Sequence, residues 1–276
     1  MSYYQLLGLE KEPFSTSPDP HFFYESKEHN SALMRLMVEI RLRRGLSLIL
    51  GDVGTGKTTL SRKLFSMLKQ REDIIFHMIL DPTYDTEEIF LDSLIRTFKI
   101  EVQTPMPSIL DYKEAIKQYL FHKGVEENKT VVLLIDEAQK LNPLSLEILR
   151  VLLNYETNEY KLLQLVLLAQ LELLPKIRQL PNLWDRISLK YVLNPLDEQE
   201  TKEMINFRIK AAGYNSMMDF FTDEAIAQIY HYTQGYPRKI SMLCHNALKL
   251  LTMQNKTVVD ARIINELIAK DVAIAV

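Results

Sequence analysis

The sequence predicts a three-layer α/β domain followed by a smaller helical domain, and three observations support this. Short apolar runs alternate with segments of helical periodicity, which is the pattern of a parallel sheet covered on both faces. A glycine-rich stretch, GDVGTGKT at 51–58, joins the first apolar run to a helical segment. The strand-like runs end before NPLDEQE at 194–200, and the rest is typical of helices. We therefore predict two domains, residues 1–195 and residues 196–276.

Five apolar runs have the length and the bounding turn residues of buried strands, and helical segments separate most of them. The predicted strands are LSLIL (46–50), IIFHMIL (74–80), VVLLI (131–135), LQLVLLA (163–169) and SLKYVL (188–193). The predicted helices of the second domain are ETKEMINFRIKAAG, DEAIAQIYHYTQG, PRKISMLCHNALKLL and DARIINELIAK.

Composition excludes several classes of protein. The 276 residues are 47% hydrophobic and 25% charged, which is ordinary globular usage with room for two cores. A net charge of −3 gives no global basic field, so nucleic acid could bind only at a local patch. The single cysteine, Cys244, lies in an apolar helical pattern and predicts a core thiol in a reducing compartment. With no signal peptide, no run long enough to span a bilayer and no metal-ligand spacing of histidines, we expect a soluble cytoplasmic protein.

The strongest chemical signal is the stretch GDVGTGKT, which has the P-loop spacing between a predicted strand and a predicted helix. Its glycines let successive backbone N–H groups point at a phosphate, and the helix N-terminus adds partial positive charge. Lys57 is expected to reach the β- and γ-phosphates of ATP, and the Thr58 hydroxyl to bind Mg²⁺. The residues expected to contact the nucleotide are Gly51, Asp52, Val53, Gly54, Thr55, Gly56, Lys57, Thr58 and Thr59.

A second signal is the acidic pair that ends the run VVLLIDEAQ. Asp136 follows a predicted central strand directly, so it is expected beside the P-loop, where it would hold Mg²⁺ through its water shell. Glu137 lies one residue further along and is expected to orient and polarise the attacking water. Alone, an acidic pair after a strand is most often only a strand terminus. Together with a P-loop, it predicts an ATPase.

Further stretches carry a resemblance that covers nearly the whole chain. The sequence resembles AAA+ ATPases of the general secretion pathway protein A type. This implies a P-loop αβα sandwich with sheet order 5-1-4-3-2 and a helical lid. It also implies a homo-oligomer, ring or filament, whose ATP cycle drives assembly of a secretion or pilus-type envelope complex. Longer members carry a membrane span and a peptidoglycan-binding domain, and we expect neither within this sequence. The matching stretches, besides the two motifs, are PFSTSPDPHFFYESKEHNSAL, LEILRVLLNYET, KLLQLVLLAQLEL, RISLKYVLNPLDEQE, RIKAAG and TQGYPRKISMLCHNAL.

The resemblance also implies further site residues, each with a structural alternative. Gln170, at the end of the fourth strand, matches sensor 1, which contacts the γ-phosphate or the water. Arg238 in GYPRKI matches sensor 2, and Arg186 in LWDRISL matches an arginine finger that reaches a neighbouring subunit. Tyr24 and His29 are candidates for lining the adenine. The structural alternatives are a plain strand end for Gln170, a solvated helix start for Arg238 and a surface ion pair for Arg186. For the two candidates at the adenine, the alternative is core packing.

One position departs from the family pattern. The residue after the second strand is usually Asn in such proteins, and here it is Asp81. We expect Asp81 near Glu137 in a partly buried site, where one of two neighbouring carboxylates would have a raised pKa. This predicts slow basal ATP hydrolysis.

A basic segment leaves two other functions open. Residues 35–71 hold nine Lys or Arg against two acidic residues. Most are expected on the solvated face of two helices, but Arg41, Arg43 and Arg44 could also follow a DNA backbone. The alternative is therefore a TnsC-like transposition regulator, an ATP-dependent filament on DNA in which slow hydrolysis is a timer. A third hypothesis is a nucleotide switch with no useful turnover.

Overall fold

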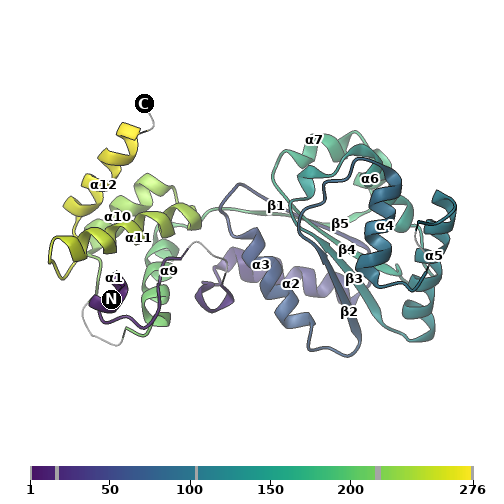
Figure 1. Ribbon diagram of the computed structural model, residues 1–276, viewed down its shortest axis with the longest axis horizontal. Helices are drawn as coiled ribbons and strands as arrows, with labels where there is room; N and C mark the ends of the chain where they lie inside the picture. The colour runs from purple at the N-terminus through teal and green to yellow at the C-terminus, as the bar shows by residue number, and fades with distance from the viewer. Residues whose placement is uncertain (1, 16–18, 103–104, 215–218, 275–276) are drawn as a thin grey trace. The chain divides into compact units, whose positions relative to one another are not determined.

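The structure is a computed structural model that describes residues 2–15, 19–102, 105–214 and 219–274 (Figure 1). It divides into two compact units, and each unit has its own hydrophobic core. The first unit comprises Met1–Lys27, Gly54–Thr59 and Asn194–Val276, and the second comprises Glu28–Val53 and Leu60–Leu193.

The second unit is built on a parallel sheet of five strands, as predicted. The strand order is β2-β3-β4-β1-β5, the predicted order. In β1, β3 and β4 every residue is buried, which explains why these strands are almost continuous apolar runs. The strands are β1 (Leu46–Gly51), β2 (Ile74–Ile79), β3 (Thr130–Ile135), β4 (Leu163–Ala169) and β5 (Ile187–Leu193).

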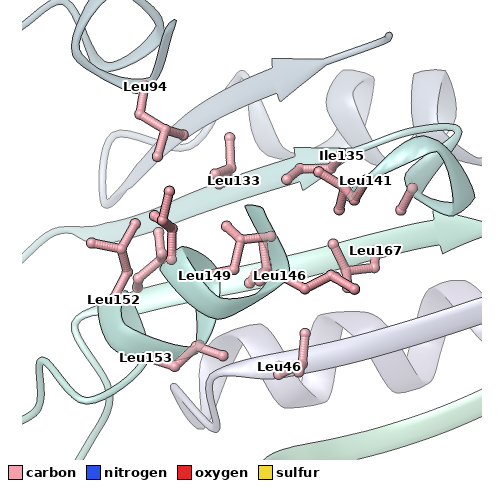
Figure 2. Packing of buried hydrophobic residues seen from close by; sticks show 14 of the residues in the cluster. Leu46, Leu94, Leu133, Ile135, Leu141, Leu146, Leu149, Leu152, Leu153 and Leu167 are labelled. Carbon is pink, nitrogen blue, oxygen red and sulfur yellow. The ribbon is translucent and has the colours of Figure 1, made fainter. Parts of the chain in front are cut away.

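Helices cover both faces of this sheet, and alternate strand residues pack against each layer. On one face, Ile49, Val132 and Val166 share a core cluster with leucines of α2 (Lys27–Arg41) and α3 (Lys57–Leu68). On the other face, Figure 2 shows leucines of α6 packed over β3 and β4. The helical elements of this second layer are α4 (Glu87–Phe98), α5 (Ile109–Phe121), η2 (His122–Glu126), η3 (Ala138–Lys140), α6 (Pro143–Leu152), α7 (Leu173–Arg178) and α8 (Pro181–Trp184).

The first unit is helical and includes the N-terminal segment. Leu9, Phe14 and Phe22 lie in one core cluster with residues of the C-terminal helices. Cys244 is fully buried there, and burial raises the pKa of its thiol, which confirms the predicted core cysteine. The helices of this unit are α1 (Tyr3–Leu6), η1 (Pro20–Phe22), α9 (Glu198–Ala211), α10 (Asp223–Thr233), α11 (Pro237–Met253) and α12 (Ala261–Ile274).

Arg43 serves the fold, which weakens the case for a DNA-binding patch. Its guanidinium donates to the hydroxyl of Thr130 at 3.0 Å and to the carbonyl of Asn128 at 3.1 Å, and it lies 4.4 Å from the Tyr160 ring centroid. These contacts hold the start of β3. Of the three arginines proposed to follow DNA, only Arg41 and Arg44 have exposed side chains. Among the described residues, no helix is both long enough and apolar enough to cross a membrane.

His77 on β2 makes the sheet unit sensitive to acid. Its Nε2 lies 3.2 Å from the Tyr119 hydroxyl and its ring packs on Phe98; burial lowers the pKa of His77 to about 4, with Lys99 adding repulsion. An unfolded histidine has a pKa near 6.5, so the unfolded state binds the extra proton as pH falls through this window. The free energy of unfolding of the wild type, relative to His77→Gln, should therefore fall as pH drops from about 6.5 to about 4. Urea unfolding across this range measures the difference, and a pH-independent difference would contradict it.

Candidate active site

The carboxyl ends of the strands define one edge of the sheet. Because all five strands are parallel, the residues that follow β1, β3 and β4 leave the sheet at this same edge. The P-loop follows β1, and Asp136 follows β3. The Asp136 carboxylate is buried, with 2% exposure, and its backbone N–H donates to the carbonyl of Ile79 at 2.8 Å. The two predicted motifs therefore leave the sheet at the edge where ligands bind in open α/β folds.

The P-loop has the backbone that its glycines permit. Gly54 and Gly56 have φ of +87° and +96°, values that glycine adopts without steric cost. Lys57 begins α3 and is 6% exposed, and Thr55 is also buried. In such a turn ahead of a helix N-terminus, the backbone N–H groups and the helix dipole favour an anionic ligand.

In the first unit, the predicted sensor 2 residue lies against this loop. The backbone N–H of Arg238 donates to the carbonyl of Gly54 at 3.3 Å. A Cβ atom added at Gly54 would lie 3.0 Å from the Cβ of Arg238, so the two backbones approach closely. Pro237 and Arg238 form the start of α11, which sets the direction in which the arginine leaves the helix. Gly54 and Arg238 are thus brought together.

After β3, the acidic pair is held by a short hydrogen-bond network. Glu137 has left-handed backbone angles, with φ 52° and ψ 34°, and its N–H donates to Oδ1 of Asp136 at 2.9 Å. Its carboxylate accepts from Nε2 of Gln139 at 2.7 Å. Oε1 of Gln139 in turn accepts from the backbone N–H of Gln170 at 3.1 Å. The structure therefore brings Asp136, Glu137 and Gln170 together through Gln139.

Sequence reasoning missed Gln139. The residue is 7% exposed, although it lies in the three-residue helix η3 directly after the acidic pair. The only signal was its place in VVLLIDEAQ, two residues after Glu137. The Lys176 ammonium, from α7, donates to the backbone carbonyl oxygen of Gln139 at 2.5 Å and so stabilises this turn.

Asp81 does not have the expected surroundings, and this expectation is wrong. Its side chain is largely exposed, with Oδ1 accepting from the Thr83 hydroxyl at 2.9 Å and from the Lys140 ammonium at 3.2 Å. These two hydrogen bonds hold the pKa of Asp81 below its ordinary value, where a buried carboxylate pair would have raised it. The prediction of slow hydrolysis from carboxylate repulsion at Asp81 therefore loses its basis.

Arg186 lies at the opposite edge of the sheet. It precedes β5, so it stands at the amino end of a parallel strand, whereas the P-loop follows the carboxyl end of β1. Its guanidinium donates to the carbonyl of Asn182 and to Oδ1 of Asn154, the latter at 2.7 Å. These are two neutral oxygens. The pKa of the Glu147 carboxylate is lowered by its main partner, Arg150, and the Arg186 charge adds to this lowering.

The two candidates for the adenine pocket belong to different units. In the first unit, the Tyr24 hydroxyl donates to Oε2 of Glu203 at 2.5 Å, and its ring packs near Phe207. Burial and the Glu203 carboxylate raise the pKa of Tyr24. In the second unit, His29 is buried on α2. An adenine contact stays a prediction for both residues.

Comparison with known families agrees with this geometry. A family model described as "AAA domain" matches residues 40–177, half of the chain, from the end of α2 through the P-loop and the acidic pair to α7. The chain belongs to the AAA domain family. The matched segment contains the strands from β1 to β4, so the AAA core carries Lys57, Asp136, Glu137 and Gln170.

Three similar proteins place this AAA chain further. General secretion pathway protein A of Aeromonas hydrophila is 38% identical over 248 residues, covering 89% of this chain and 44% of that protein. The AAA chain thus spans less than half of that relative. The Aeropyrum pernix ORC2 protein in its ADPNP-ADP complexes has a TM-score of 0.65 at 15% identity, covering 95% of this chain and 71% of that one. Drosophila ORC bound to DNA has a TM-score of 0.67 at 19% identity, covering 98% and 66%. These two structures show the shared fold alone.

Proposed function

We propose that this AAA protein binds ATP with Mg²⁺ and hydrolyses it to ADP and phosphate. The observation that carries the proposal is the buried Asp136 and half-buried Glu137 at the end of β3, at the same sheet edge from which the P-loop leaves β1. A P-loop cradles phosphates, and the acidic pair supplies a metal ligand and a group that orients water. Neither half alone would favour hydrolysis over simple binding.

The residues fit a magnesium ion that arrives with the nucleotide. Mg²⁺ prefers oxygen ligands and keeps several waters, so one hydroxyl and one carboxylate from the protein suffice beside phosphate oxygens. Thr58 in the first turn of α3 and Asp136 after β3 offer these groups. When bound, the ion would neutralise charge on the phosphates. The protein's own work is then done by Lys57, which contacts the phosphates, and by Glu137, which accepts a hydrogen bond from the attacking water.

We further propose that ATP promotes a homo-oligomer, ring or filament, and that its cycle drives assembly of a secretion or pilus-type envelope complex. The oligomer is supported by Arg186, which lies at the sheet edge opposite the P-loop and would serve a neighbouring copy. The client is supported only by the 38% identity to General secretion pathway protein A. We expect slow hydrolysis by the isolated protein because each site would need that neighbour.

Two variants test whether the site hydrolyses ATP. Lys57→Ala should weaken ATP binding strongly, because Lys57 contacts ground-state phosphates. Glu137→Gln should retain ATP binding and lower the hydrolysis rate by about 100-fold or more, because Glu137 contacts only the water. Calorimetric titration with ATP and Mg²⁺ measures binding, and phosphate release measures turnover.

The comparison between these variants is the decisive result. Equal loss of ATP affinity in Lys57→Ala and Glu137→Gln would mean that Glu137 has been given the wrong role. A wild type that binds ATP but releases no phosphate over a wide range of protein concentration would instead favour the nucleotide switch.

A further inference from the structure

Gln139 has a side-chain amide whose two ends are both used inside the second unit. Its NH₂ group faces a carboxylate oxygen of Glu137 at 2.7 Å, and its carbonyl oxygen faces the backbone N–H of Gln170 at 3.1 Å. A carboxylate can only accept and a backbone N–H can only donate. The two partners therefore fix one orientation of the amide, and among side chains of this length only glutamine satisfies both.

Among the described residues, the Gln139 amide is the only hydrogen-bond partner of the Glu137 carboxylate; the other hydrogen bonds of Glu137 are made by its backbone, to Oδ1 of Asp136 and from the N–H of Lys140. Its backbone is in the left-handed region, which non-glycine residues adopt at a cost of roughly 1 kcal/mol or more. The Asp81 carboxylate, which follows the neighbouring strand β2, is engaged by Lys140 and Thr83. The contact from Gln139 is charge-assisted, and such bonds are shorter and stronger than neutral ones.

We propose that Gln139 is a positioning residue that couples the Glu137 carboxylate to the carboxyl end of β4. The inference rests on the proposed function, in which Glu137 orients the attacking water. Gln170, the predicted sensor of the γ-phosphate, contributes its backbone N–H to the same amide. A shift of the β4 end on nucleotide binding is thus passed through one side chain to Glu137. Gln139 acts through Glu137 and touches no reacting atom.

The main test replaces the amide by an apolar chain of similar length. Gln139→Met removes both hydrogen bonds, so Glu137 is free to leave the water-orienting position. We expect kcat to fall about 10- to 100-fold, the cost of misplacing a catalytic group by about 1 Å, with ATP affinity changed by less than about twofold. Calorimetric titration and phosphate release measure the two quantities, and thermal melting reports stability.

Gln164 offers a matched control near the amino end of β4, the strand whose carboxyl end leads to Gln170. It is 2% exposed, its Oε1 accepts from the N–H of Gly45 at 2.9 Å, and its Nε2 donates to the carbonyl of Lys161 at 2.8 Å. Gln164→Met therefore removes two hydrogen bonds from an equally buried glutamine. We expect it to lower the melting temperature at least as much as Gln139→Met and to leave kcat unchanged.

Gln139→Glu separates the two contacts. Its carboxylate can still accept from the Gln170 N–H, but it has no group to donate to Glu137 and would repel that carboxylate instead. We expect kcat to fall at least as far as in Gln139→Met, with ATP affinity changed by less than about twofold. A variant that only perturbs folding would lower kcat and the amount of ATP bound together.

These outcomes separate the inference from the function on which it rests. If wild type hydrolyses ATP and Gln139→Met keeps its kcat, or loses kcat no more than Gln164→Met, the positioning role is overturned while the ATPase stands. A Gln139→Glu variant that keeps the kcat of the wild type overturns it too. If the wild type binds ATP without turnover, the proposed function has failed first.

Discussion

Arg186→Ala is expected to bind ATP nearly as well as the wild type and to hydrolyse it roughly 10³-fold more slowly, at the low end of the range for arginine fingers. The reason is geometric. The side chain stands at the amino end of β5, and the P-loop at the carboxyl end of β1, so Arg186 does not face its own γ-phosphate. In a ring or filament it would face the nucleotide of the next subunit. There a guanidinium neutralises charge that develops in the transition state.

Mixing subunits distinguishes action in trans from a local defect. Arg186→Ala and Glu137→Gln are each expected to be inactive alone. In a mixed assembly some interfaces pair an intact Glu137 with an intact Arg186 of the neighbour, so part of the phosphate release should return. The control is Arg96→Ala, which removes an exposed arginine paired with Asp92 on α4 and should leave the rate unchanged. Mixtures that co-assemble by cross-linking and still release no phosphate would assign Arg186 to the fold, through its contacts with Asn154 and Asn182.

Gly235→Ala is expected to destabilise the first unit by about 3–5 kcal/mol. Gly235 has a φ of +73°, which alone costs a non-glycine residue about 1–2 kcal/mol. Its added Cβ would also lie 1.9 Å from the carbonyl oxygen of Leu196, and the Leu196 N–H is bonded to the Gly235 carbonyl at 2.9 Å. Because the contact would be with the backbone of Leu196 and not with a flexible side chain, two backbone segments would have to separate.

Gly8→Ala is the matched control for backbone strain. Gly8 lies in the same unit with a φ of +75°, but an added Cβ meets no atom within 4 Å. It should therefore cost only the strain, about 1–2 kcal/mol. Urea unfolding followed by circular dichroism gives both values, while the fluorescence of Trp184, the single tryptophan, reports the sheet unit. Equal losses in the two variants would show that the approach to Leu196 relaxes without cost.

The fold was predictable because its signals are local and repeated. Each strand of the sheet is a short apolar run, and each later helix has a periodic apolar face, so burial by itself produced the pattern. Periodicity gave no packing partner for the N-terminal segment. Leu9, Phe14 and Phe22 carry no regular spacing, and their partners in the core lie between Leu196 and Ile264.

The position of the candidate site was predictable from the spacing of its two motifs. The P-loop and the acidic pair each follow a strand, so their side of the sheet followed from strand direction. Gln139 and Asp81 were harder because their roles depend on which neighbour each side chain faces. Whether a polar residue in a tight turn faces water or the interior depends on a single backbone dihedral angle. Here the backbone of Glu137 is in the left-handed region, and the side chain of Gln139 faces the interior. The ammonium of Lys140, the next residue in the turn, instead donates a hydrogen bond to the carboxylate of Asp81.

The packing of Leu9, Phe14 and Phe22 with the C-terminal helices also sets an order for folding on the ribosome. Their core is made from a segment synthesised before the sheet unit and from helices synthesised after it. The sheet unit can collapse first, because all of it is synthesised before the C-terminal helices and domains generally fold as units. Until the later helices emerge, the early apolar side chains wait without their partners. Once the intervening unit has folded, the N-terminal segment and the C-terminal helices are no longer joined by a long flexible loop. The loss of chain entropy on bringing them together is therefore smaller.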